Sequence, residues 1–423
     1  MWFYGVVKGI CRLLLCHQWF NIYASFGRKQ SFFCMEIKHD ISTKKRSGNK
    51  GMKITAVKTF LVNAERQNWV FVKVETDEGI YGWGEASVEG QEKAVEAAIY
   101  TLAERSVIGE DPRNVDKIWQ QMYRHGFWKG GFIYNSAISG IDQAIWDIKG
   151  KILGVPTYEL LGGKVRDKIK TYTHARDPET AAKAMANGFS GVKTGVGPGT
   201  VIDDPSSQAA ALDKRLSEIR QAVGPEGVIC IDHHGQGNVK DTLGLIKVAA
   251  NYNLYFFEEP VSPENAQLYR EISNNIYGVP VAAGERLFSR FDFREVITNQ
   301  WLDFIQPDIC HCGGISEIRK IGYMAEPYLI RYAPHNPNGP VATAASIQVC
   351  AAAQNFDILE FSSGVYNRPD IYDFDFKPEN GFFKIPTKPG LGIELDEAAM
   401  AKHEYVFIQY TPRFKVDGTP AEI

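Results

Sequence analysis

The chain has 423 residues, of which 44% are hydrophobic and 23% charged, a composition typical of a soluble protein with one large domain or two ordinary ones. Its net charge of -3 provides no basic field, so we expect neither nucleic acid nor a membrane as a partner. The seven cysteines include no CxxC pair, which argues against a disulfide framework or a zinc pattern and favours the cytoplasm.

The segment 1–51 differs in character from the chain that follows. It holds no acidic residue before Glu36, and Lys8 and Arg12 interrupt its apolar stretches, which argues against a membrane span. At Met52 the sequence begins like a first strand. We therefore interpret residues 1–51 as a disordered leader or an over-extended start, with an organellar targeting peptide as the alternative.

The next part of the chain mixes strand and helix patterns. Two strand-like runs, 53–62 and 69–86, are joined by a polar turn, and helical patterns follow as far as residue 154. These patterns predict an α+β capping domain over residues 52–165.

Short apolar strands then alternate with helical stretches. The strands are expected at 169–174, 191–195, 227–234, 254–260, 279–285, 303–310, 331–335 and 356–361. Eight strands that alternate with helices predict an α/β fold, a (β/α)7-8 TIM-like barrel, over residues 166–369. We expect residues 370–423 to pack back on the capping domain.

Polar residues stand at the C-terminal ends of six of these runs. They are Asp232, Glu258, Glu285, Asp308, His335 and Glu360. Parallel barrels assemble their active sites at that end of the strands, although any one such residue could simply bond a loop backbone. Because six strand ends carry such residues, we expect them to form one active site.

Three of the six are carboxylates, Asp232, Glu258 and Glu285, spaced 26 and 27 residues apart, about one strand and helix each. Adjacent strands would therefore bring them together as three oxygen ligands, which suits Mg²⁺ and disfavours zinc. Glu258 is followed by Glu259, and neighbours on a strand point to opposite faces. Strand alternation alone leaves open which of the two binds the metal.

Several motifs together resemble the mandelate racemase branch of the enolase superfamily, and within it the galactonate dehydratases. They are "CIDHHG", "FFEEPV", "AAGERLFSRFDF", "QPDICHCGGISE", "APHNPNGPVATAAS" and "GFFKIPTKPGLGIELDE". The resemblance extends from about Met52 to Glu397. It implies an enolase-like fold and makes Glu258 the Mg²⁺ ligand beside Asp232 and Glu285.

The resemblance also implies roles for four other residues. His335 matches the general base, and Asp308 matches the partner that orients its imidazole. His234 would be the general acid for the departing 3-hydroxyl. Glu360 would hydrogen-bond the enediolate, which requires it to be protonated or closely paired. His233, between Asp232 and His234, is interpreted as structural.

Departures from the wider pattern bear on the substrate. Where the racemases carry Lys-x-Lys, this chain reads Lys193-Thr194-Gly195, so a second base for racemisation is missing. Lys193 is expected to contact a substrate carboxylate or to form an ion pair. The stretch from Glu85 to Ala94 is expected to close over the substrate or to form a solvent loop, and His125 and Lys129 are expected to line the same lid.

The resemblance implies Mg²⁺-dependent dehydration of a sugar acid, with D-galactonate as the first expectation. The alternative in the same class is another aldonate, such as gluconate or arabinonate. A racemase or cycloisomerase and a non-catalytic homologue are the alternatives from other classes. The family also leads us to expect a homo-oligomer.

Overall fold

The computed structural model describes residues 51–197, 204–409, 412–415 and 417–421. Of the predicted leader, only Gly51 is among them, so that interpretation lies outside the described residues. In the described part of the chain, no helix combines the length and the apolar character that crossing a membrane requires.

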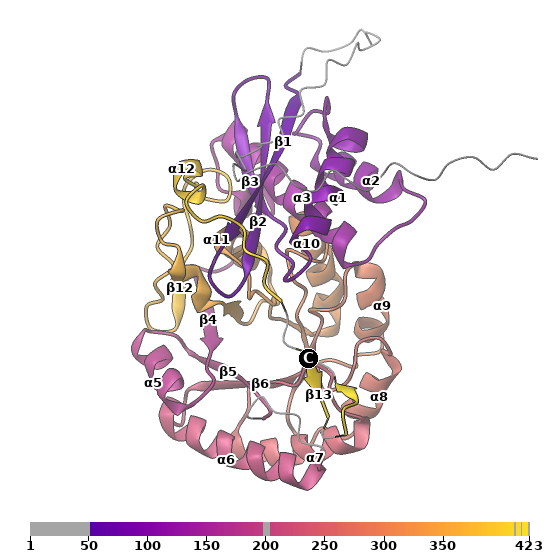
Figure 1. The fold of residues 1–423 in the computed structure, drawn as a ribbon, viewed down its shortest axis with the longest axis vertical. Coiled ribbons are helices and arrows are strands. Elements are labelled where there is room, and N and C mark those ends of the chain that lie inside the picture. The colour runs from indigo at the N-terminus through magenta and orange to yellow at the C-terminus, as the bar shows by residue number, and fades with distance from the viewer. Residues whose placement is uncertain (1–50, 198–203, 410–411, 416, 422–423) are drawn as a thin grey trace, which may run out of the picture. The chain divides into compact units, whose positions relative to one another are not determined.

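The described chain opens with a three-stranded antiparallel sheet and a group of helices. The sheet has the order β1-β2-β3, and Figure 1 shows it at the top. The elements are β1 (Ile54–Asn63), β2 (Asn68–Thr76), β3 (Tyr81–Glu85), α1 (Glu92–Leu102), the π-helix η1 (Ala103–Val107), α2 (Val115–Arg124), α3 (Phe132–Leu153) and α4 (Thr157–Leu160).

Helix α3 packs directly against strand β3, and glycines permit the close approach. A Cβ atom at Gly84 would lie 1.9 Å from the Gly140 carbonyl oxygen, and one at Gly82 would lie 2.1 Å from that of Ala144. Between Asn135 and Ile148 every residue of α3 is buried. The helix is therefore a central element that neighbours cover on all sides.

Eight parallel strands form the second part of the fold. They are β4 (Lys168–His174), β5 (Gly191–Gly195), β6 (Val228–Asp232), β7 (Phe256–Glu258), β8 (Val281–Ala283), β9 (Phe304–Ile305), β10 (Arg331–Tyr332) and β11 (Leu359–Phe361). Their order is β10-β9-β8-β7-β6-β5-β4-β11. The ring closes because Tyr332 N donates to Asn355 O and Asp357 N donates to Tyr332 O, each over 2.9 Å, just before β11. Seven of the eight strands lie within the predicted stretches, and β4 begins one residue earlier, at Lys168.

An α-helix follows each strand of the ring except the last, and Figure 1 shows several of these helices on the outside of the strands. The helices are α5 (Pro178–Ala186), α6 (Pro205–Val223), α7 (Val239–Ala249), α8 (Gln267–Ser273), α9 (Arg290–Thr298), α10 (Gly314–Ala325) and α11 (Pro340–Ala352). Short 3-10 helices are η2 (Ala250–Tyr252), η3 (Glu326–Tyr328) and η4 (Ser363–Asn367). The predicted α/β barrel with an α+β N-terminal part is confirmed.

A cluster of buried side chains fills the centre of the ring. It is Tyr172, Val228, Cys230, Phe256, Ala282, Phe304, Ala333 and Ile358. Because strand side chains repeat with a period of two, the residue two positions further on faces the same interior, closer to the C-terminal strand ends. For seven of these residues that position holds His174, Asp232, Glu258, Gly284, Gln306, His335 and Glu360. The barrel interior thus changes from apolar to mainly polar toward the C-terminal strand ends.

The C-terminal residues contact both parts of the fold. Strand β12 (Phe382–Lys384) pairs antiparallel with β4, and α12 (Glu397–Met400) follows. A further two-stranded sheet joins β13 (Arg413–Phe414) to β14 (Pro420–Ala421). Glu394 accepts a 3.2 Å hydrogen bond from the indole of Trp83. The domain boundaries at residues 165 and 369 stay predictions.

Candidate active site

Three carboxylates meet at the C-terminal ends of adjacent strands. Asp232 ends β6, Glu258 ends β7 opposite it, and Glu285 follows β8 by two residues. One oxygen from each lies within 4.8 Å of the other two. Oxygen atoms alone make up this donor set, which suits a hard divalent cation. Of the two neighbouring glutamates, Glu258 faces this group, whereas Glu259 is bonded to Arg286 (2.6 Å).

Lys193 lies in the middle of this acidic group and is buried. Its Nζ is 3.1 Å from Asp232 Oδ2, 3.0 Å from Glu258 Oε2 and 2.8 Å from Glu360 Oε1. Burial acts to lower the pKa of Lys193, but these three negative charges outweigh it and raise the pKa well above its usual value. The residue therefore forms an ion pair in the protein, and a contact with substrate stays a prediction.

The carboxylates of the triplet oppose one another electrostatically. Burial, and then the charge of Asp232, raise the pKa of Glu258 well above its usual value. Burial also acts to raise the pKa of Asp232, but Lys193 and a hydrogen bond from His234 hold it below its usual range. Buried like charges need compensation by positive charge. A divalent cation bound between the three oxygens would supply it, so these residues fit a metal.

His335 and Asp308 form an imidazole–carboxylate pair beside the triplet. Nδ1 of His335 is 2.8 Å from Asp308 Oδ2, and Nε2 is 3.0 Å from Glu285 Oε2. Asn338 Nδ2 donates to both oxygens of Asp308 (3.0 and 2.9 Å), which holds this carboxylate in place. Burial opposes the charged form of His335, but the charges of Glu285, Glu360 and Asp308 raise its pKa well above the usual value.

Glu360 is fully buried and closely paired. Oε1 contacts Lys193 Nζ (2.8 Å) and His174 Nε2 (2.5 Å), and Oε2 accepts from the backbone N–H of Asn336 (3.0 Å). Although burial acts the other way, Lys193 and His335 lower the pKa of Glu360 well below its usual value. Of the two conditions expected for this residue, protonation or close pairing, the geometry provides close pairing.

His174 was not predicted as a site residue, although it belongs to the same cluster. It is the last residue of β4, and its imidazole bonds Glu360 while part of it remains exposed. The sequence did indicate this residue, because His174 is the last residue of the predicted strand 169–174. The other six polar residues were identified by the same kind of position at the C-terminal end of a strand. Asn338 was missed as well, and a loop asparagine carries no such positional signal.

His234 reaches Asp232 through a turn. Strand β6 ends at Asp232, and His234 adopts a left-handed conformation with φ 51°. Its Nε2 lies 3.2 Å from Asp232 Oδ2, and the half-exposed side chain faces the triplet. Strand alternation predicted the correct side, but the positive φ turn is what places the ring there. His233 is buried, stacks edge-on against Phe257, and has its pKa lowered to about 4 by burial, which agrees with a structural role.

Three other predicted residues are not brought into this cluster. Glu85 is fully buried, and its carboxylate accepts hydrogen bonds from Ser87 Oγ (2.6 Å), Gly339 N (2.7 Å) and Ala342 N (2.9 Å) at the start of α11. His125 and Lys129 are exposed between α2 and α3. A role of these three in substrate binding stays a prediction.

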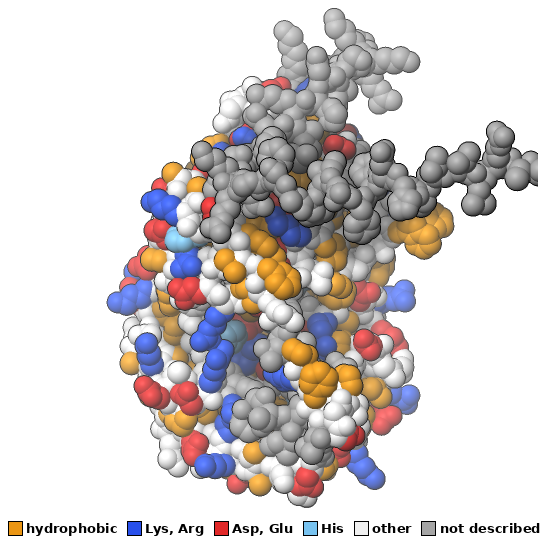
Figure 2. Space-filling view, viewed as in Figure 1, with side chains coloured by type: hydrophobic (Ala, Val, Ile, Leu, Met, Phe, Trp, Pro, Cys, Tyr) orange, Lys and Arg blue, Asp and Glu red, His pale blue; other side chains and the backbone are white. Residues whose placement is uncertain are grey.

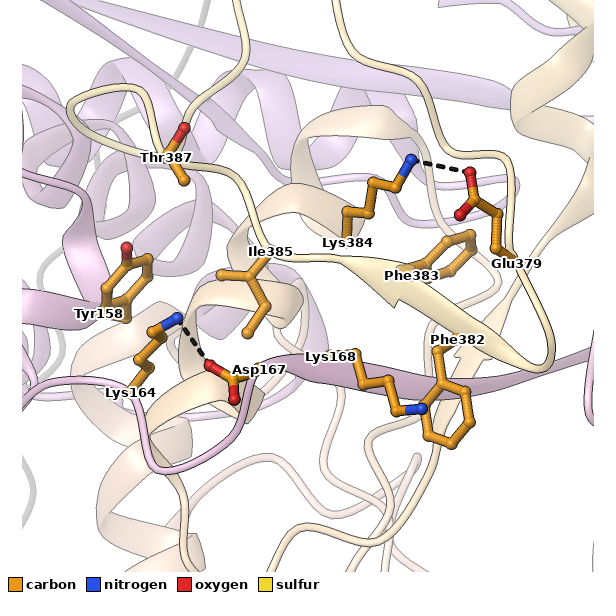
Figure 3. A pocket seen from close by; sticks show the side chains of 10 residues that line it. All are labelled: Tyr158, Lys164, Asp167, Lys168, Glu379, Phe382, Phe383, Lys384, Ile385 and Thr387. Carbon is orange, nitrogen blue, oxygen red and sulfur yellow. Dashed lines mark hydrogen bonds and ion pairs between the residues drawn. The ribbon is translucent and has the colours of Figure 1, made fainter.

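The described part of the surface is hollowed in more than one place. Figure 2 shows Lys and Arg side chains beside a hollow on the face viewed. A separate cavity of about 320 Å³ lies at the other end of the barrel, where β4 begins (Figure 3). Two of its three lysines are bonded to carboxylates, Lys164 to Asp167 and Lys384 to Glu379, and Lys168 lies over the ring of Phe382. That cavity therefore has no cluster comparable with the strand-end group.

Comparisons with known proteins agree with this geometry. Residues 46–162 match the family model "Mandelate racemase / muconate lactonizing enzyme, N-terminal domain", and residues 177–399 match "Enolase C-terminal domain-like". D-galactonate dehydratases from Ralstonia pickettii and Ralstonia nicotianae are 44% and 43% identical over 360 residues, which covers 82% of this chain and 93% of each relative. An enolase from Agrobacterium radiobacter, solved with Na and L-malate bound, is 30% identical with a TM-score of 0.81, covering 87% of this chain and 99% of that one.

Proposed function

The chain belongs to the mandelate racemase/muconate lactonizing enzyme family of enolase-like proteins, and from that premise we propose that it dehydrates a sugar acid, with D-galactonate as the first substrate. The observation that carries the proposal is that two histidines reach one carboxylate triplet. His335 Nε2 lies 3.0 Å from Glu285, and His234 Nε2 lies 3.2 Å from Asp232. A base and an acid beside one site are what elimination of water requires.

The proposed metal is Mg²⁺, held by Asp232, Glu258 and Glu285. When bound, this ion acts as a Lewis acid that stabilises negative charge on the substrate carboxylate. The positive charge of Lys193 at the same group suits an anionic substrate, because it offers further compensation as the α-carbon is deprotonated.

His335 is the proposed base for the proton at C2. Asp308 holds the Nδ1 side of the imidazole, which leaves Nε2 to accept the proton. The neighbouring charges of Glu285 and Glu360 stabilise the protonated ring that forms when the proton is taken. Glu360 itself is held as a carboxylate by Lys193 and His174, and we assign it the role of orienting those donors toward the enediolate.

His234 is the proposed acid for the 3-hydroxyl. It donates a proton to the oxygen as the C3–O bond breaks, so that the group leaves as water while a double bond forms between C2 and C3. The enol then tautomerises to the 2-keto-3-deoxy acid. The overall change is the loss of one water molecule, and no oxidant or reductant is needed.

Racemisation is not favoured by the residues present. It needs a second base opposite His335, and the strand β5 position that would provide it is Gly195. The names of the two Ralstonia relatives support dehydration instead. Within that class another aldonate, such as gluconate or arabinonate, is the alternative to D-galactonate, and the experiment below separates them.

Location and assembly belong to the same proposal. The four cysteines among the described residues are free and buried, which suits a reducing cytoplasm. A small sugar acid is the proposed partner, and a homo-oligomer of this chain is the proposed assembly.

The test is a screen of aldonates with Mg²⁺ present and detection of 2-keto-3-deoxy products, with the His335→Asn variant as a blank. Conversion of D-galactonate supports the full proposal. Conversion of another aldonate alone would retain the reaction and change the substrate. No product from any aldonate would contradict the proposed function.

A further inference from the structure

The second glutamate of the pair at the end of β7 is buried without joining the triplet. Glu259 has no solvent exposure, and Arg286 binds it in a bidentate manner. Arg286 Nε lies 3.0 and 2.9 Å from the two carboxylate oxygens, and Nη2 lies 2.6 Å from Oε2. Such a fork fixes the guanidinium in one orientation.

The same guanidinium reaches the loop that carries the proposed acid. Arg286 Nη2 also donates a 2.7 Å hydrogen bond to the backbone carbonyl of His234. The backbone adds a parallel connection, because Gly235 N donates to the carbonyl oxygen of Glu259 over 2.8 Å. Glu259 and Arg286 therefore bond to His234 and to its neighbour in the chain.

The turn at His234 needs such support. His234 has φ 51° and Glu259 has φ 39°, and left-handed backbone costs a non-glycine residue about 1 to 2 kcal/mol. Gly235 follows with φ 65°, and a Cβ atom there would lie 2.9 Å from Arg286 Nη2. The guanidinium thus packs against the turn as well as bonding to it.

We propose that Glu259 and Arg286 are positioning residues for His234, holding its carbonyl so that the imidazole stays beside Asp232. The inference rests on the proposed function, in which His234 protonates the departing hydroxyl. Neither Glu259 nor Arg286 touches the reacting atoms. Their effect is to fix the chain conformation from which His234 reaches the substrate.

This role predicts that loss of Glu259 or Arg286 slows expulsion of the 3-hydroxyl more than it slows removal of the C2 proton. His335 takes the C2 proton independently of the turn, whereas expulsion of the 3-hydroxyl depends on His234. When the acid is misplaced, the protonated His335 exchanges its proton for deuterium from D₂O. It then returns the deuterium to C2, and the enediolate goes back to substrate. A pair that merely stabilised the fold would lower proton exchange and dehydration together.

The experiment measures C2–H exchange in D₂O by proton NMR and 2-keto-3-deoxy product formation for the same samples. Arg286→Gln and Glu259→Gln should lower dehydration at least about tenfold, raise the ratio of exchange to dehydration at least about tenfold, and leave KM within about threefold. Arg286→Lys should fall between them and the wild type, because lysine cannot form the fork. His234→Asn gives the reference ratio for complete loss of the acid.

A matched control is Arg290→Gln. Arg290 binds the buried carboxylate of Glu317, also 27 residues away, but is not bonded to the His234 turn. Its loss should cost stability without changing the ratio. An unchanged ratio of exchange to dehydration in Arg286→Gln would overturn the inference. It would also be overturned if Arg286→Lys or Arg286→Gln kept full activity and its crystal structure showed His234 in the same left-handed conformation.

Failure of the proposed function is distinguishable from failure of the inference. If the wild type dehydrates no aldonate, the proposed function fails, and the inference is then decided by the crystal structures alone. Retention of the His234 turn in Arg286→Gln would contradict positioning, and displacement of His234 would support it. If Arg286→Gln does not fold, Arg286→Lys, which keeps the charge, is measured in both ways.

Discussion

Two groups of buried carboxylates differ in what neutralises them. The first lies at the C-terminal strand ends of the barrel and consists of the fully buried Glu258, Asp308 and Glu360 and the partly buried Asp232 and Glu285. The second lies where the N-terminal sheet and helix α3 meet the rest of the chain and consists of Glu85, Asp142 and Asp147. Cationic side chains surround the first group, whereas mainly backbone N–H groups bind the second.

Two carboxylates of the second group cap helices, whereas Asp147 accepts hydrogen bonds from Trp83 N and Leu391 N and pairs with Lys151. Asp142, on α3, accepts from Ser316 N (2.8 Å) and Ser316 Oγ (2.6 Å) in the first turn of α10. Glu85 accepts from Gly339 N and Ala342 N at the start of the next helix, α11. Carboxylates in these places satisfy helix donors that lack intrahelical partners. The N-terminal part of the fold is thereby attached to two consecutive barrel helices.

The protonation states differ accordingly. Burial raises the pKa of both Glu85 and Asp142 to about 7, because neutral amides only partly compensate for the lost solvation. Asp308 and Glu360 are equally buried, yet nearby lysine and histidine charges hold their pKa values below the usual range. In this comparison Asp308 and Glu360, which cations face, keep their charged form, whereas burial and the charge of Asp232 raise the pKa of Glu258 in spite of Lys193.

The largest expected effect is at the histidine of the first group. His335→Asn should lower the rate of dehydration by about 10² to 10⁴-fold and abolish C2–H exchange, because the base is removed. Steady-state kinetics and NMR in D₂O measure the two. His403→Asn, which alters a surface His403–Asp370 pair, is the matched control and should keep both rates. Persistent exchange in His335→Asn would mean that another residue is the base.

A substitution at a metal ligand should lower activity without lowering stability. Glu258→Gln should reduce turnover below about a hundredth of the wild type, while the unfolding free energy without divalent ions stays equal or rises, because burial and the charge of Asp232 already oppose a charged side chain at this position. Mg²⁺ should raise the melting temperature of the wild type and not of the variant. Calorimetry with and without Mg²⁺ tests this. A loss of more than about 2 kcal/mol in stability would place Glu258 with the helix-capping group and break the comparison.

Glu85→Ala should show the opposite behaviour. Two amides at the start of α11 lose their acceptor in a buried position, so the unfolding free energy should fall by about 2 kcal/mol. The KM of the folded enzyme should stay within about threefold of the wild type. Denaturant unfolding and initial-rate kinetics measure the two quantities. A large rise in KM with intact stability would restore the expected substrate contact of Glu85.

The first group could be predicted from the sequence and the second could not, for a physical reason. Strand-end carboxylates recur once per strand and helix, so Asp232, Glu258 and Glu285 stand out by their spacing alone. Asp142 lies within a helix that is buried all round, and its partner Ser316 is 174 residues away, so no local pattern marks it.

Glu85 shows the limit of reading a motif from its neighbours. The stretch that it opens is expected to close over the substrate or to form a solvent loop, but the residue ends a buried strand and bonds residues more than 250 positions later. The missed His174 is a different case, since its strand-end position gave the same signal as its neighbours. Long-range partners, rather than local propensity, decide what each of these residues does.

The smallest expected effect is a pH dependence of stability carried by Asp142. Its pKa is about 7 in the folded protein against 3.8 for an ordinary aspartate, so the folded state binds the proton more tightly than the unfolded state. Its contribution is therefore fully present below about pH 4 and is lost as the pH rises toward 7. Between pH 6 and pH 7 the unfolding free energy should fall by about 1 kcal/mol on this account. Asp142→Asn cannot titrate, so its stability relative to the wild type should rise by that amount over the same interval. Urea unfolding of both proteins at pH 6 and pH 7 gives the difference directly. A pH-independent difference would mean that Asp142 stays ionised in the fold, and the contrast between amide-bound and cation-bound carboxylates would then lose its electrostatic basis.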